Sequence, residues 1–201
     1  LQQAEDADDA APVVDGTDNL AATINLGSNT FTYYGNTYTG ADFIYVGANG
    51  LITTALPYIN AANTNLTTAP LQATIAPFWD DIDSRCRTDD GIFYQAFGSG
   101  SSAYVIFEWS NWDHYSCSGS ARYTFQAILY SDGSIVFQYL NMLDQGSAAV
   151  GIENQDGSMG AGYTGTLTNG LAVRFVASGV ATLTPTPTVT STPTLTPTAT
   201  I

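Results

Sequence analysis

The sequence predicts an all-β fold, a single antiparallel β-sandwich of the jelly-roll kind with an extended C-terminal tail. Three observations predict this class. Short runs rich in Val, Ile, Thr, Tyr and Phe recur along the chain, as pleated, half-buried strands prefer. Gly, Asn and Asp turns separate these runs, and no window keeps a helical period over three turns. Many short strands joined by frequent turns are typical of sandwiches and jelly rolls.

The expected strands follow from apolar runs bounded by turn residues. In chain order they are 31–34, 43–47, 51–54, 72–78, 92–97, 104–109, 122–130, 135–139, 148–153 and 171–176. Two hairpins are expected, and the one with the turn 131–134 is the clearest. Asn49-Gly50 joins one pair of strands, and the turn 131–134 joins another. We expect residues 57–70 to form a loop.

Three segments are expected along the 201 residues. Residues 1–20 form an acidic N-terminal arm, either exposed or pairing late as a strand. Residues 21–178 form the β-sandwich domain, which is long enough to bury a core. Residues 179–201 form the Thr/Pro-rich tail.

Composition limits the location and the partners. The net charge is -14, and charged residues make up only 11% of the chain. Because so few residues are charged, Thr, Ser, Asn, Gln and Gly must form most of the solvent-exposed surface, as in many extracellular β-proteins. The negative charge argues against binding to nucleic acid. No apolar run approaches the length of a membrane span, so we expect no membrane insertion. We therefore expect an extracellular or cell-surface protein.

The two cysteines, Cys86 and Cys117, predict one disulfide in an oxidising compartment. The bridge would close about thirty residues and stabilise the fold by roughly 3–4 kcal/mol. Two free buried thiols are the alternative, which the polar loop setting of both residues disfavours.

An acidic segment between two expected strands is the one concentrated constellation of ligand-type side chains. Its carboxylates are Asp80, Asp81, Asp83, Asp89 and Asp90. Calcium takes six to eight oxygen ligands, largely carboxylates and carbonyls, so Ca²⁺ is the cofactor that this segment predicts. The alternatives are Asp-rich turns that satisfy their own backbone, or neutralisation by Arg85 and Arg87.

Catalytic constellations are weak, and we expect no enzyme. His114 is the only histidine, no Gly-x-Ser-x-Gly elbow is present, and the chain has no lysine. Glycoside hydrolysis needs two carboxylates, for which Glu108 and Glu153 are candidates. The alternative for Glu108 is an outward-facing residue on a strand whose other face is apolar.

The tail has a strict alternation. Every even position from Thr182 to Thr200 is Thr, and an extended chain would place these residues on one face. The O-glycosylation candidates are Thr184, Thr186, Thr188, Thr190, Thr192, Thr194, Thr196 and Thr198. Apolar residues recur every six positions, at Leu183, Val189, Leu195 and Ile201, and align both in a strand and in polyproline II. The tail is either a stiff glycosylated linker or an assembly strand whose apolar residues dock on a neighbour.

Several strings together resemble a known family. They are FTYYG at 31–35, YVGANGLI at 45–52, IAPFWDDID at 75–83, TFQAILYSDG at 124–133 and VGI at 150–152. In order and spacing they resemble nidogen-like (NIDO-type) domains, including those of bacterial secreted and surface proteins. The resemblance implies an extracellular β-rich module of adhesion or matrix proteins, without known catalysis.

The expected function is that of a non-catalytic structural subunit. It would self-assemble into a surface filament or layer, with the tail docked on a neighbouring copy. The alternative is an adhesive or carbohydrate-binding accessory module, which binds glycans or surface ligands and uses the tail as a linker.

Overall fold

The structure, a computed structural model, describes residues 12–14, 16, 18–64, 66, 73–85, 90–117, 122–142 and 146–176. Over these residues the chain forms β-strands and two single 3₁₀ turns, and no α-helix. Among the described residues, no helical turn is long or apolar enough to cross a membrane.

One sheet, called the back sheet here, has six antiparallel strands. Their spatial order is β1 (Ala21–Asn25), β4 (Phe43–Gly47), β5 (Leu51–Thr53), β6 (Thr74–Trp79), β12 (Ala149–Glu153) and β13 (Gly160–Gly162). The hairpin β4–β5 turns at the expected Asn49-Gly50.

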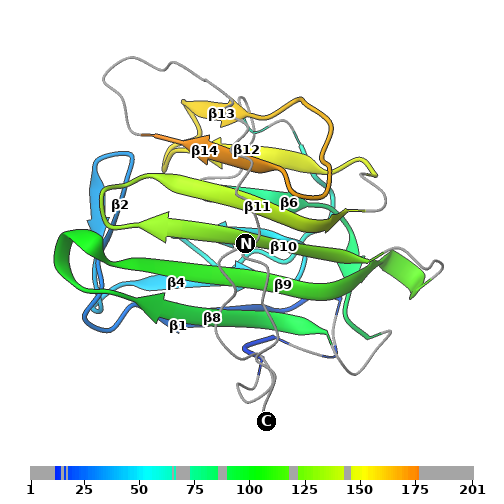
Figure 1. Cartoon of the computed structure of the whole chain (residues 1–201), viewed down its shortest axis with the longest axis horizontal. Helices are drawn as coiled ribbons and strands as arrows, with labels where there is room; N and C mark the ends of the chain where they lie inside the picture. Colours follow the sequence, from blue (N-terminus) through cyan, green and yellow to red (C-terminus); the bar gives the residue numbers. More distant parts are fainter. Residues whose placement is uncertain are drawn as a thin grey trace, which may run out of the picture.

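The second sheet, called the front sheet, faces the viewer in Figure 1. Its order is β14 (Ala172–Phe175), β11 (Ile135–Met142), β10 (Tyr123–Tyr130) and β9 (Tyr104–His114). Two shorter strands share the far side of β9: β8 (Gly91–Phe97) pairs with its first part and β7 (Ile82–Asp83) with its end. The described chain therefore forms an antiparallel sandwich, as predicted.

A small hairpin, β2 (Phe31–Tyr33) with β3 (Asn36–Tyr38), is fastened to the back sheet by Tyr33. The buried Tyr33 hydroxyl donates to the carbonyl of Thr74 at 2.7 Å and accepts the N–H of Glu153 at 3.1 Å. Burial raises the pKa of this hydroxyl well above its usual value, so it stays protonated and able to donate.

The core lies between the sheets and follows the alternation of the strands. On β9, Val105, Phe107 and Trp109 point inward, whereas Ile106 and Glu108 point to the outer face. The inward residues of β10 and β11 meet them in one cluster that also contains residues of β4 and β6. Apolar residues at every second position explain why these segments form a sandwich.

Polar groups of core aromatics join the two sheets. The Tyr139 hydroxyl on β11 donates to the carbonyl of Pro77 on β6 at 2.7 Å. Pro77 cannot donate to a ladder, and it lies where the pairing of β6 with β12 shifts register. A proline in this inner strand is therefore tolerated, and its carbonyl gains a partner from the opposite sheet.

The observed strands differ from the expected ones mainly at β9, which runs to His114 rather than to residue 109. Asn111 has φ 59°, and the register with β10 shifts opposite it. This bulge turns both Trp109 and Trp112 toward the core, although they are three positions apart. Four short strands, β1, β3, β7 and β13, were not expected, because they are brief or rich in small and polar residues.

The described part of the N-terminal arm pairs with the front sheet. Val13 donates its N–H to the Ile92 carbonyl at 2.7 Å, and Ile92 donates to the Val14 carbonyl at 2.8 Å. Val14 is buried in the core cluster. This segment thus lies along the start of β8.

Candidate functional site

The acidic segment lies where β6 ends and β7 begins. Asp80 and Asp81 follow β6, and Asp83 is fully buried in β7. In the pairing of β7 with β9, Asp83 lies opposite Asp113, which is also buried. Two carboxylates that face each other in a ladder repel when both are charged, so this pair calls for a nearby cation.

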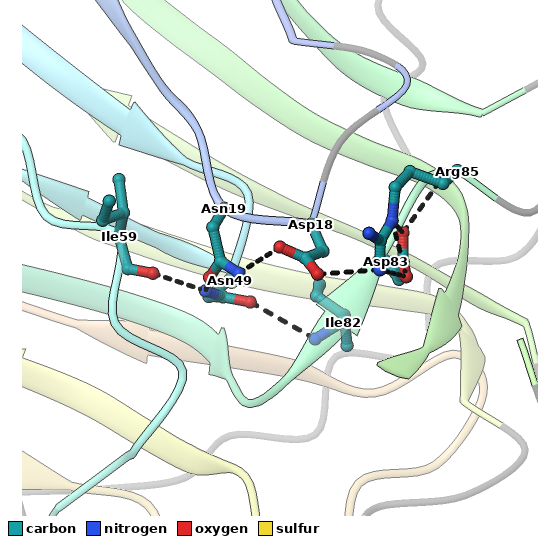
Figure 2. A network of polar contacts seen from close by, with 7 residues as sticks. All are labelled: Asp18, Asn19, Asn49, Ile59, Ile82, Asp83 and Arg85. Atoms are coloured by element: carbon teal, nitrogen blue, oxygen red, sulfur yellow. Dashed lines mark hydrogen bonds and ion pairs between the residues drawn. The ribbon is translucent and has the colours of Figure 1, made fainter. Parts of the chain in front are cut away.

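Arg85 supplies that cation. Its Nε lies 3.0 and 3.1 Å from the two carboxylate oxygens of Asp83, and its Nη2 lies 2.6 Å from Oδ2 (Figure 2). The Arg85 backbone N–H also donates to Asp83 Oδ1, and Nη2 pairs with Asp18 at 2.7 Å. Burial alone would raise the pKa of Asp83, but the hydrogen bonds and charge of Arg85 outweigh burial and lower it.

A buried amide organises the loops beside this ion pair. Asn49 Nδ2 donates to the Ile59 carbonyl at 2.8 Å and to Asn19 Oδ1 at 3.0 Å. Its oxygen accepts the N–H of Ile82 at 3.4 Å (Figure 2). The sequence identified Asn49 only as a turn residue. Its link to three separate segments depends on contacts that no local pattern encodes.

Asp80 is held by two loops. Its Oδ1 accepts hydrogen bonds from Asn63 Nδ2 at 3.4 Å, from the Ser147 hydroxyl at 3.3 Å and from the Asp81 N–H at 3.0 Å. Asn63 also donates to the carbonyl of Ser147 at 2.9 Å. Asp80 therefore fixes the loop that follows β5 against the one that precedes β12.

Asp81 differs from its neighbours because it is partly exposed. Burial and the nearby Asp18 carboxylate raise its pKa, and His114 partly opposes them. The Asp81 carbonyl accepts the N–H of Tyr115 at 2.9 Å. The acidic segment is thus bound to the end of β9.

The predicted calcium ligands are only partly gathered. Within the described ranges, no three His, Cys, Asp or Glu side chains come together as a metal-binding group. Both oxygens of Asp83 are engaged by Arg85, which was the alternative considered from the sequence. Asp90 is buried just before β8, and Asp89 lies outside the described residues. A calcium site here stays a prediction.

Cys117 is disulfide-bonded and ends the 3₁₀ turn Tyr115–Cys117 that follows β9. Cys86, its partner as predicted from the sequence, lies outside the described residues.

The carboxylates considered for glycoside hydrolysis belong to different sheets. Glu108 lies on the outer face of β9, accepts a hydrogen bond from Gln126 of β10, and has a pKa raised by burial. Glu153 is fully buried in β12 of the back sheet. The structure places each within its own sheet and not across a shared site.

Three aromatic rings form a row on the outer face of the front sheet. Phe97 of β8 stacks on Tyr104 of β9 with ring centres 5.0 Å apart, and Tyr104 lies 5.4 Å from Tyr130 of β10. All three side chains are half-buried. No local pattern in the sequence signals this row, because its members come from three different strands.

The tail residues that were predicted to dock or to carry glycans all lie outside the described residues. The last described strand before them is β14, at the edge of the front sheet.

Two antiparallel sheets joined by hydrogen bonds of buried aromatic side chains, with an acidic segment in which Arg85 pairs with Asp83, define an all-β module. The chain belongs to the NIDO-related family, whose model matches residues 4–197. Domains of this type are generally extracellular. The match confirms the resemblance to nidogen-like domains. No curated protein and no solved structure matches the chain.

Proposed function

We propose that this chain is a non-catalytic extracellular structural subunit that self-assembles, with the tail of one copy docked on the next. One observation carries the proposal, the position of proline in the tail. All four prolines after residue 182, at 185, 187, 193 and 197, occupy odd positions, and all even positions are Thr.

Backbone direction gives this pattern a physical meaning. In an extended strand, the N–H and C=O groups of successive residues point to opposite edges. The edge formed by the odd residues lacks donors at every proline, whereas the edge formed by the Thr residues keeps every N–H. Such a tail can pair fully along one edge only, which suits a strand added to the rim of a sheet.

The family match supports the same proposal, because it continues through the domain to residue 197 and so includes most of the tail. The extracellular location typical of the family fits glycans on the Thr residues. For the non-catalytic part, the support is the separation of Glu108 and Glu153 on different sheets.

The test compares the full chain with a version that ends at Gly179. Electron microscopy and light scattering should show ordered polymers of the full chain and only monomers of the shortened one. Polymers of both versions would overturn the role of the tail. Monomers of both would overturn self-assembly and leave the second candidate.

The second candidate is a carbohydrate-binding accessory module with the tail as a glycosylated linker. The row of Phe97, Tyr104 and Tyr130 favours it, because adjacent rings on a sheet face can stack on sugars. A glycan array should then give binding that Tyr104→Ala reduces at least tenfold and that Phe43→Ala, an exposed aromatic on the other sheet, leaves unchanged.

A further inference from the structure

The outer edge of β14 is open within the described chain. β14 pairs with β11 on one side, through Val173 opposite Phe137 and Phe175 opposite Ile135. Just before the strand, the Leu171 carbonyl accepts the N–H of Tyr139 at 3.1 Å. No other strand among the described residues pairs with β14.

Alternation identifies which groups this edge presents. Since Leu171 faces β11, Val173 and Phe175 face it too, and the N–H and C=O groups of Ala172 and Arg174 point away from the sheet. Unpaired backbone groups along an edge strand are a template for another strand. The side chains of Ala172 and Arg174 lie on the outer face, and those of Val173 and Phe175 on the core face.

The tail fits this edge in one orientation. In an antiparallel pair, residues that exchange hydrogen bonds lie opposite each other with side chains on the same face. Thr residues bonded to Ala172 and Arg174 would therefore lie on the outer, solvent face. The odd residues, which include Leu183, Val189 and the prolines, would lie on the core face, and those paired with β14 would lie beside Val173 and Phe175.

A parallel arrangement would reverse these faces. In a parallel pair, a residue whose N–H and C=O bond to the partner strand lies opposite a partner residue whose own N–H and C=O point away. The Thr residues would then lie opposite Val173 and Phe175 on the core face. The apolar residues of the tail would lie on the outer face, in water. Hydrophobic burial therefore selects the antiparallel orientation.

We propose that the tail of a second copy adds to β14 as an antiparallel edge strand, bonded through its Thr backbone to Ala172 and Arg174. This inference rests on the proposed self-assembly, and it identifies β14 as the strand that binds the tail. The Thr side chains stay accessible to glycans in this arrangement, and one of the apolar residues that recur every six positions extends the core of the accepting copy.

Length favours a second copy over the tail's own domain. Residues 182–201 span about 65 Å when extended, and the eleven residues of β9, the longest described strand, span about 36 Å. A tail that keeps its alternation along this length reaches beyond the domain that carries it.

The experiment uses the full chain and two tail variants. Ala172 and Arg174 can bond two consecutive Thr residues, so proline at every second Thr (Thr186→Pro, Thr190→Pro, Thr194→Pro and Thr198→Pro together) removes one bonded N–H wherever the tail docks between Thr184 and Thr200. Ser191→Pro with Ala199→Pro instead adds prolines to the edge that already carries them. The first variant should raise the concentration required for polymers by up to about tenfold, because one lost hydrogen bond weakens the contact by up to about that factor. The second should change it less than twofold.

A third variant tests the acceptor. Ala172→Pro removes the outward N–H of β14 and leaves the pairing with β11 intact, so polymers should be lost while the thermal unfolding temperature of the monomer is kept. Hydrogen exchange should show Ala172 and Arg174 protected in polymers and unprotected in monomers.

Each contrary result has a distinct meaning. Polymers unaffected by Ala172→Pro and by the Thr-edge prolines would overturn β14 as the acceptor and leave tail-driven assembly standing. Protection of Ala172 and Arg174 in monomers would show the tail on its own domain and overturn the second copy. Failure of the unsubstituted chain to polymerise would overturn both proposals.

Discussion

Trp109 donates its indole N–H to the carbonyl of Gly47, 3.0 Å away across the sandwich. Trp109 is fully buried in β9 of the front sheet, and Gly47 ends β4 of the back sheet. Because Gly47 closely precedes the Asn49-Gly50 turn, this hydrogen bond connects the core to the loops around the acidic segment. Packing and the polar network therefore depend on each other.

We expect Trp109→Phe to destabilise the protein by about 2–3 kcal/mol, because it removes ring volume and leaves the buried Gly47 carbonyl without its donor. Denaturant unfolding measures the loss. Phe43→Leu, at an exposed aromatic in the same strand as Gly47, is the control and should cost less than about 0.5 kcal/mol. Equal costs for the two variants would contradict the role given to Trp109.

Gly50→Ala should destabilise by about 2 kcal/mol or more. Gly50 has φ 73°, and a Cβ there would lie 1.8 Å from the Phe78 carbonyl oxygen, so β6 would have to move. Gly35 has φ 85°, and a Cβ added to it would meet no atom within 4 Å, so Gly35→Ala should cost only about 1 kcal/mol of backbone strain. The unfolding temperatures of the two variants measure this difference. The loss in Gly35→Ala reports backbone strain alone, and the additional loss in Gly50→Ala reports the steric clash with Phe78.

The Asp83–Arg85 pair predicts a pH dependence. The pKa of Asp83 is lowered in the folded chain, so its contribution to stability is present at neutral pH and is lost as pH falls below about 4. Arg85→Ala should lower the unfolding temperature at pH 7, and the gap to the unsubstituted chain should close in acid. A gap that stays constant with pH would show that Arg85 acts by packing alone.

Glu108 predicts a pH dependence of stability opposite in sign to that of Asp83. Burial raises its pKa above the usual value near 4.5, and the bond from Gln126 only partly offsets this. Its contribution is therefore lost as pH rises through the folded pKa. Glu108→Gln should therefore stabilise the chain at pH 7 and have no effect at acid pH, where Glu108 is protonated. Urea unfolding of the variant and the unsubstituted chain at pH 7 and at acid pH measures the difference in stability. Destabilisation by Glu108→Gln at pH 7 would contradict a free-energy cost of burying the Glu108 charge.

Calcium binding at the acidic segment predicts that Ca²⁺ raises the unfolding temperature relative to EDTA. A concentration about one hundred times the dissociation constant stabilises by about 2.7 kcal/mol. Asp81, the partly exposed carboxylate of the segment, is the ligand to test, and Asp81→Asn should remove the effect. An unfolding temperature that Ca²⁺ leaves unchanged would exclude a calcium site there.

Local chemistry makes part of this molecule predictable. The turns Asn49-Gly50 and 131–134 follow from residues that adopt tight turns, and alternating apolar runs place the flanking strands. The pairing of Arg85 with Asp83 is foreseeable because the two residues are close neighbours in the chain. The share of Asp18 in that pair is not, since it lies 67 positions from Arg85 and meets it only through the fold.

The bulge at Asn111 is a second feature that the sequence pattern does not predict. A period-two pattern predicts that Trp109 and Trp112 point to opposite faces, so it does not foresee that both indoles enter the core. One residue with φ 59° changes the parity and sends both rings inward. The free energy gained by burying the second indole exceeds the cost of disrupting the strand pairing at the bulge. That gain comes from contacts in the core, which the local sequence does not show.

The two sides of the front sheet are unlike, since Val13 and Val14 lie along β8 and β14 has no described strand beyond it. If each copy gives its tail to one neighbour and receives a tail from another, the contact is heterologous and repeats from copy to copy, whereas reciprocal exchange between two copies would close a dimer. Repetition of the heterologous contact produces a polar fibre with distinguishable ends. One end would show a vacant β14 and the other an unbound tail, so the two ends would grow at different rates.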